Sequence, residues 1–83
     1  MYEIRFSKQA KKDIAVLTPK LKDKLKALLR DVIATEPFSG KKLTGDLQGS
    51  YSFRLTYQDR IVYQVDTTKK IVYVERAKTH YGE

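Results

Sequence analysis

"SYSFRLTYQDRIVYQVDTTKKIVYVERAK", residues 50–78, contains three strand-like runs that follow one another closely. Alternate positions of the first run are apolar: Tyr51, Phe53, Leu55 and Tyr57. The second and third runs are rich in β-branched and aromatic residues, and the links between runs are short enough for hairpins. The stretch therefore predicts a three-stranded antiparallel meander whose apolar face needs a covering layer.

The residues before the meander predict a strand and a pair of helices. Residues 2–6 alternate apolar and charged side chains, which indicates a short edge strand. Ser7 is a good N-cap for a first amphipathic helix, and Thr18 followed by Pro19 is a good start for a second. The second helix should end near residue 35, because Pro37 disfavours helix in the residue before it. The sequence thus predicts one α+β domain spanning residues 1–83, in which a helical hairpin packs on the meander.

The strand alternation also predicts a surface opposite the helices. If Tyr51, Phe53 and Leu55 face the helices, Arg54 points to the uncovered face of the sheet. Arg60 shares that surface in a suitable register. Four more residues should lie near it, two from the long loop at residues 37–50 and two after the last strand: Lys41, Lys42, His80 and Tyr81. We expect a concave basic surface with the chain's one histidine at its rim.

Composition narrows the partners of such a surface. The 83 residues include no cysteine and one histidine, which excludes a disulfide framework and histidine-rich or thiolate metal sites. The net charge of +7 indicates a polyanionic partner, such as nucleic acid, the ribosome, a membrane surface or an acidic protein. No apolar segment is long enough to span a membrane, and the N-terminus has no apolar signal region. A cytoplasmic protein is the expectation.

Three features of the chain together resemble the RelE/ParE toxin superfamily of bacterial toxin–antitoxin modules. They are the pattern L-x-G-x-L-x-G-x-Y-x-x-R-L at residues 43–55, the pattern Y-x-x-R-I-V-Y-x-V at residues 57–65, and the ending "RAKTHYGE". The resemblance is closest to the YoeB-like and RelE-like mRNA interferases, which are ribosome-dependent endoribonucleases. It implies the small RelE-like fold over the whole chain.

The resemblance also implies roles for individual residues. Arg60 matches the arginine that holds the scissile phosphate, and His80 matches the histidine that YoeB-like toxins use as general acid. Tyr81 matches their terminal tyrosine, and Arg54 matches a second basic residue of the substrate surface. The implied reaction is attack of the ribose 2′-hydroxyl on the adjacent phosphate, with no metal ion and no small-molecule cofactor.

The general base is the point at which the chain departs from the family pattern. YoeB-like toxins carry a glutamate base in the loop before the second strand, and here Lys41 and Lys42 occupy that position. RelE-like members use lysines in this region. Asp46 is the nearest carboxylate, although it does not match the motif position. The sequence leaves the base open among Lys41, Lys42 and Asp46, while the two lysines also suit phosphate binding.

The implied partners are translated mRNA, the ribosomal A site and a cognate antitoxin protein, with no membrane. Two other functions fit the same residues. One is a ParE-like toxin that inhibits DNA gyrase without cleaving RNA, and the other is a non-catalytic basic module that binds RNA or ribosomes. At the level of single residues, Arg60 has the alternative of a surface ion pair with Asp59 or Glu75.

Overall fold

The meander predicted from residues 50–78 is present in the computed structural model, which describes residues 1–79. Its strands are β3 (Tyr51–Arg54), β4 (Asp59–Asp66) and β5 (Ile71–Thr79), paired antiparallel in that order. Alternate residues of β4, Ile61 and Tyr63, are fully buried beneath the helices. The first run is shorter than its sequence pattern suggests. Tyr57, expected on the apolar face, lies in the turn after β3 and is 88% exposed.

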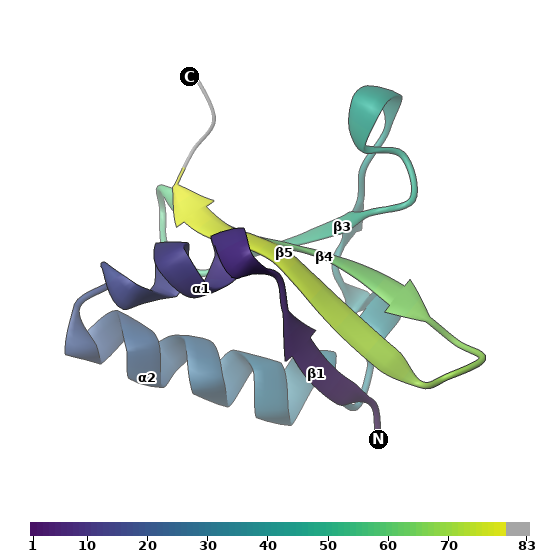
Figure 1. The fold of residues 1–83 in the computed structure, drawn as a ribbon, viewed down its shortest axis with the longest axis horizontal. Helices are drawn as coiled ribbons and strands as arrows, with labels where there is room; N and C mark the ends of the chain where they lie inside the picture. Colours follow the sequence, from purple (N-terminus) through teal and green to yellow (C-terminus); the bar gives the residue numbers. More distant parts are fainter. Residues whose placement is uncertain (80–83) are drawn as a thin grey trace.

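Two further strands complete a five-stranded mixed sheet in the order β1-β5-β4-β3-β2 (Figure 1). The predicted edge strand is confirmed as β1 (Glu3–Phe6), which runs parallel to β5. The other edge is β2 (Lys41–Lys42), which pairs with Tyr51 and Ser52 of β3. This strand lies inside the segment that the sequence predicts as a loop, because two lysines carry no strand signal of their own.

Both helices begin where the sequence predicts. Ser7 Oγ accepts a hydrogen bond from the Ala10 amide at the start of α1 (Lys8–Ala15). Thr18 Oγ1 accepts one from the Leu21 amide at the start of α2 (Pro19–Leu28). A π-helical turn, Leu29–Ile33, extends α2, so the helical run ends close to the expected residue 35.

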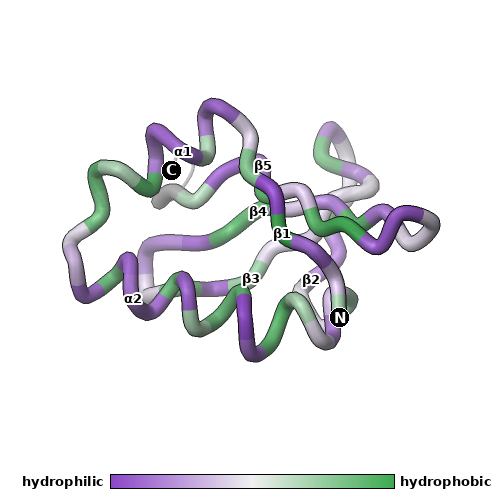
Figure 2. The backbone as a smooth tube through the Cα atoms, turned by 60° about the horizontal axis from the view of Figure 1, so that its bottom comes forward, coloured by the Kyte–Doolittle hydropathy of each residue, from purple (hydrophilic) through white to green (hydrophobic). Residues whose placement is uncertain are grey.

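The core lies between the helices and one face of the sheet (Figure 1). Apolar and polar residues alternate along the chain in both layers, as the hydropathy colouring of the backbone shows (Figure 2). The helical layer, the sheet and the turn after β3 contribute the buried residues Ala10, Leu25, Leu29, Ile33, Leu55, Ile61, Tyr63, Val72, Val74 and Ala77. No helix in the described part of the chain is long and apolar enough to cross a membrane.

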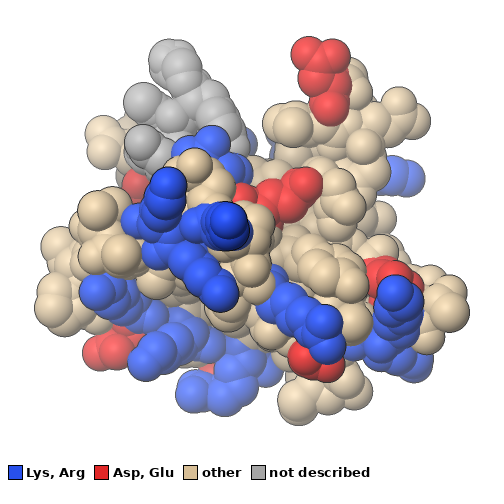
Figure 3. Space-filling view, in the orientation of Figure 1, with Lys and Arg blue, Asp and Glu red and all other residues tan. Residues whose placement is uncertain are grey.

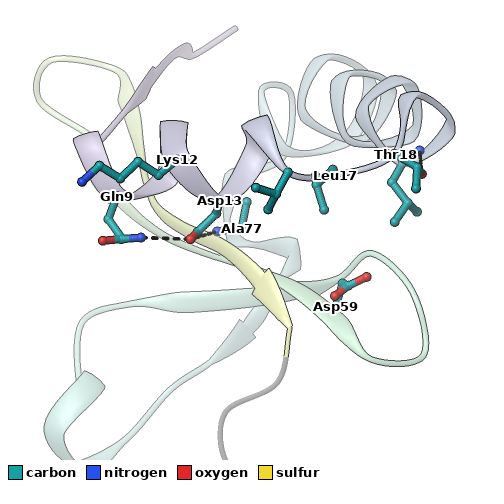
Figure 4. A pocket seen from close by; sticks show the side chains of 9 residues that line it. Gln9, Lys12, Asp13, Leu17, Thr18, Asp59 and Ala77 are labelled. Atoms are coloured by element: carbon teal, nitrogen blue, oxygen red, sulfur yellow. Dashed lines mark hydrogen bonds between the residues drawn. The ribbon is translucent and has the colours of Figure 1, made fainter.

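Asp13 fastens α1 to the last strand. Its side chain is only 4% exposed and accepts hydrogen bonds from Arg76 Nε at 2.8 Å, the Ala77 amide at 3.1 Å and Gln9 Nε2 at 3.1 Å. Figure 4 shows Asp13 between Gln9 and Ala77. Burial raises the pKa of Asp13, but the hydrogen bonds from Arg76, Ala77 and Gln9 together outweigh it. The pKa of this carboxyl therefore lies below its ordinary value.

Replacing Asp13 with asparagine should destabilise the protein in a pH-dependent way. With a lowered folded-state pKa, ionised Asp13 stabilises the fold above about pH 3.9, its usual unfolded value, and this stabilisation disappears as pH falls through the folded-state pKa. We expect Asp13→Asn to lower the free energy of unfolding by about 1–3 kcal/mol at pH 7. The difference in unfolding free energy between the variant and wild type, measured by urea denaturation, should become smaller at acid pH.

The matched control is Asp31→Asn. Asp31 also pairs with an arginine, Arg30, but both side chains are exposed to solvent. Exposed pairs contribute little to stability, so this variant should unfold close to wild type. An Asp13→Asn protein as stable as the Asp31→Asn protein at pH 7 would show that the buried carboxylate does not anchor the helix.

Gly40 places β2 by letting the backbone approach a buried tyrosine. Tyr63 Oη donates a hydrogen bond to the Pro37 carbonyl at 2.7 Å. A Cβ atom at Gly40 would overlap Tyr63 Oη and would lie 2.8 Å from the Ser52 carbonyl oxygen. Only glycine fits here without movement of its neighbours, and Lys41 begins β2 at the next position.

The Gly40→Ala variant should therefore be less stable by about 1–3 kcal/mol, the usual cost of an overpacked core position. Tyr63→Phe removes the phenol oxygen that the new methyl group meets. The loss caused by Gly40→Ala should consequently be smaller in a Tyr63→Phe background, as measured by thermal unfolding of the four proteins in this cycle. Additive losses would contradict the proposed contact.

Candidate functional site

Two arginines face each other across the hairpin that joins β3 to β4. Arg54 and Arg60 are direct partners in the antiparallel register. Directly opposed residues lie on the same face of a sheet, and alternation along β4 puts this face opposite the core residues Ile61 and Tyr63. The hairpin is closed by the Leu55 amide, which donates to the Asp59 carbonyl at 2.8 Å.

Lys41 joins the arginines from the short edge strand. It pairs with Ser52 of β3, and one hollow of 160 Å³ is lined by Lys41, Ser52, Arg54 and Arg60. The structure thus brings together three of the basic residues that the sequence predicted for one surface. Ser52 also lines this hollow, although no pattern in the sequence marked it as a site residue.

Neither arginine of this hollow has an ion-pair partner among the side chains that the structure describes. The two carboxylates suggested as partners for Arg60 bind elsewhere. Asp59 accepts a hydrogen bond from Thr56 Oγ1 at 3.0 Å, and Glu75 accepts from Ser50 and Gln64. The surface ion pair is therefore not formed. Opposed like charges destabilise a sheet, whereas a phosphate between two guanidinium groups would offset that repulsion.

The other predicted site residues lie away from the hollow or outside the described chain. Lys42 is exposed and pairs with Tyr51, and Asp46 is exposed in the 3₁₀ turn Gly45–Leu47. Neither residue lines the hollow, so Lys41 is the one base candidate of the three that does so. His80 and Tyr81 lie outside the described residues.

The backbone of β5 leads toward this site. Lys78 pairs with Arg60, and Thr79 pairs with Asp59 at the end of the ladder. Lys78, the residue of β5 opposite Arg60, thus comes two residues before His80 in the sequence. This register agrees with the expectation that the last strand ends beside the basic surface.

Glu75 is a polar residue of this face to which sequence reasoning gave no site role. Its two carboxylate oxygens accept from Ser50 Oγ at 2.8 Å and from Gln64 Nε2 at 3.0 Å. Glu75 lies opposite the register shift between Val62 and Tyr63, which directs it to the open face. A bulge has no signature in the alternating pattern of β5, so this position could not be recognised from the sequence.

A second surface lies between β1 and the two helices, and we call it the basic-rimmed groove. Its apolar walls form two adjoining hollows of 360 and 380 Å³ that share Phe6, Lys26 and Leu29. Lysine and arginine side chains gather over this side of the molecule (Figure 3). The basic residues among those that line the groove are Lys11, Lys22, Lys26 and Arg30.

Comparison with known structures reveals close relatives of the whole fold. The RelBE2 toxin–antitoxin complex of Mycobacterium tuberculosis contains a chain with 26% identity and a TM-score of 0.86, covering 95% of this chain and 98% of that one. The heterotetrameric YoeB–YefM complex of Staphylococcus aureus contains a chain with 29% identity and a TM-score of 0.80, and the match covers 98% of this chain and 99% of that one. The YoeB dimer of the same species has 30% identity and a TM-score of 0.79, and the match covers 96% of this chain and 98% of that one.

The RelE-like α+β fold that the resemblance implied is therefore confirmed. No curated protein is similar enough in sequence to count as a match. A family model described as the YoeB-like toxin of bacterial type II toxin–antitoxin system matches residues 6–81. With nearly the whole length matched, this chain belongs to the YoeB-like toxin family of bacterial type II toxin–antitoxin systems.

Proposed function

We propose that this toxin is a ribosome-dependent endoribonuclease that cleaves translated mRNA and thereby inhibits translation. The observation that carries the proposal is the hollow in which Lys41, Arg54 and Arg60 meet without an acidic partner among the described side chains. Its planar guanidinium groups suit a phosphate, because each can bind two oxygens at once. Their charge also suits the extra negative charge that a phosphorane carries in the transition state.

In the proposed reaction the ribose 2′-oxygen attacks phosphorus, and the bond from phosphorus to the 5′-oxygen breaks. The products carry a 2′,3′-cyclic phosphate and a 5′-hydroxyl. A base takes the proton of the 2′-hydroxyl, and an acid gives a proton to the departing 5′-oxygen. No step requires a metal ion. Arg60 and Arg54 hold the phosphate, and His80 is the acid by family resemblance, since histidine exchanges protons near neutral pH.

Lys41 is the base candidate that this arrangement favours. Of the three candidates it alone lines the hollow beside both arginines. Tyr81 and Lys42 remain contacts to the RNA in the proposal. The ribosomal A site would present the codon and supply positioning that a hollow of 160 Å³ is too small to supply alone.

The first test is mRNA cleavage in a reconstituted translation reaction with and without ribosomes. Wild-type protein should cut mRNA only when ribosomes translate it. Arg60→Ala should slow cutting by about 10²–10³-fold, the usual effect of removing one group that stabilises transition-state charge. His80→Gln should slow it by about 10²–10⁴-fold, because it removes a positioned acid. Cut sites are mapped by primer extension.

Arg5→Ala is the matched control, because Arg5 is an exposed arginine of β1 that pairs with Glu3 and does not line the hollow. It should cut like wild type. Intact mRNA with wild-type protein would refute the nuclease proposal, and a DNA gyrase supercoiling assay would then test the ParE-like alternative. Ribosome binding without cutting would instead favour the non-catalytic module.

The partner proposal concerns the basic-rimmed groove. The relatives from M. tuberculosis and S. aureus were solved as toxin–antitoxin complexes. We infer that the cognate antitoxin of this toxin lays an acidic amphipathic segment in the groove. Its apolar side chains would cover Phe6, Ile14 and Leu29, and its carboxylates would meet the lysines at the rim.

Reversing charge at the rim should weaken antitoxin binding. We expect Lys22→Glu with Lys26→Glu to raise the dissociation constant at least about tenfold at low salt, with a smaller effect at high salt because exposed charges are screened. The control pair is Lys20→Glu with Lys24→Glu, which changes the same helix by the same charge outside the groove. Calorimetric titration with the antitoxin encoded by the neighbouring gene measures both. Equal losses would mean that only net charge matters.

A further inference from the structure

Glu75 occupies a β-bulge beside the basic hollow. Val62 pairs with Arg76 and Tyr63 pairs with Val74, so Glu75 has no partner residue on β4. Its backbone carbonyl accepts a hydrogen bond from Ser7 Oγ at 2.9 Å, which holds the bulge in place. Bulges redirect side chains and are over-represented next to active sites. Here the bulge directs a carboxylate toward Ser50 and Gln64 on the open face of the sheet.

The carboxylate of Glu75 is held in place by two hydrogen bonds and can accept more. Ser50 Oγ donates to Oε1 at 2.8 Å, and Gln64 Nε2 donates to Oε2 at 3.0 Å. An ionised carboxylate accepts about four hydrogen bonds, so each oxygen keeps capacity for another donor. Both donors are neutral, and none of the ion pairs found within the described chain involves Glu75. Two hydrogen bonds thus hold this carboxylate at a defined position, with no ion-pair partner among the described side chains.

The hollow and Glu75 lie along one line of the sheet. Arg60 and Gln64 are four residues apart on β4, which corresponds to about 13 Å of strand at the usual rise. Ser50, Ser52 and Arg54 follow the same course on the neighbouring chain segment, and Ser50 and Ser52 are buried. A single-stranded RNA that followed this line from a phosphate in the hollow would bring a neighbouring base to Glu75.

The chemistry of a carboxylate selects among the four bases. It accepts hydrogen bonds and cannot donate them when ionised. The Watson–Crick edge of guanine presents two adjacent donors, N1–H and the N2 amino group. Adenine and cytosine each place an acceptor beside their single amino donor, and uracil flanks one N–H with two carbonyls. Single-stranded RNA is read on these edges, and bonds to an ionised acceptor are the stronger ones.

We propose that Glu75 is a specificity residue that binds the Watson–Crick edge of a guanine next to the scissile phosphate. This inference rests on the proposed nuclease function and adds to it a base preference and the group responsible. A purely structural role, in which Glu75 only ties Ser50 to Gln64, predicts lower stability in a Glu75→Gln protein but no change in base preference.

The test replaces guanine with inosine at the nucleotides flanking one strong cut site of an mRNA in the reconstituted translation reaction. Inosine lacks the N2 amino group and keeps N1–H. Wild-type protein should cut the inosine mRNA at least about tenfold more slowly, the size expected for one lost hydrogen bond to a charged group. Glu75→Gln, which is nearly isosteric, should cut the two mRNAs at rates within about twofold of each other.

Glu36→Gln is the charge-matched control, because Glu36 is exposed in the segment after α2 and does not line the hollow. It should keep the wild-type discrimination. Equal cutting of guanine and inosine mRNA by wild-type protein would overturn the Glu75 inference and leave the nuclease proposal intact. Full discrimination by folded Glu75→Gln protein, checked by thermal unfolding, would overturn it too. Absence of any cutting by wild-type protein would refute the nuclease proposal itself, and the inference with it.

Discussion

The pairing of β4 with β5 is the constraint on which both faces of this protein depend. The strand β4 lies inside the sheet between β5 and β3, and its residues alternate between the core face and the open face of the sheet. Ile61 and Tyr63 are fully buried in the core, while Arg60 and Gln64 point to the opposite face. A shift of one residue in this register would exchange the two sets and bury charge in the core. The free energy of core packing therefore also fixes where the arginine pair stands.

The sequence predicted most of the fold because its strongest signals are local. The caps at Ser7 and Thr18 act within one helical turn, and the alternation of residues 50–78 is a property of each strand by itself. The features it did not predict arise from contacts between distant residues. The strand β2 forms because Gly40 packs closely on Tyr63 and brings Lys41 opposite Ser52. Tyr57 departs from the expected face because the hairpin closes before it.

The same distinction applies to the candidate site. Arg54 and Arg60 were placed together correctly, since antiparallel pairing around a short turn leaves few registers. The three base candidates were equivalent in sequence, and only the pairing of β2 with β3 separates Lys41, which lines the hollow, from Lys42 and Asp46. No pattern in the sequence marked Glu75 as a site residue. Its position depends on a bulge whose carbonyl is bound by Ser7, which is 68 residues away in the chain.

The chain has 17 lysines and arginines and 10 aspartates and glutamates. The basic hollow is not neutralised by the acidic residues near the sheet, because these residues bind other groups. Asp13 is bound to Arg76 at the edge of the sheet, and Asp59 to Thr56 in the turn. Glu75 takes its hydrogen bonds from Ser50 and Gln64. Each of these three carboxylates thus has a partner other than Arg54 and Arg60. Arg54 and Arg60 are directly opposed like charges, which destabilise a sheet, and none of these three carboxylates relieves that repulsion.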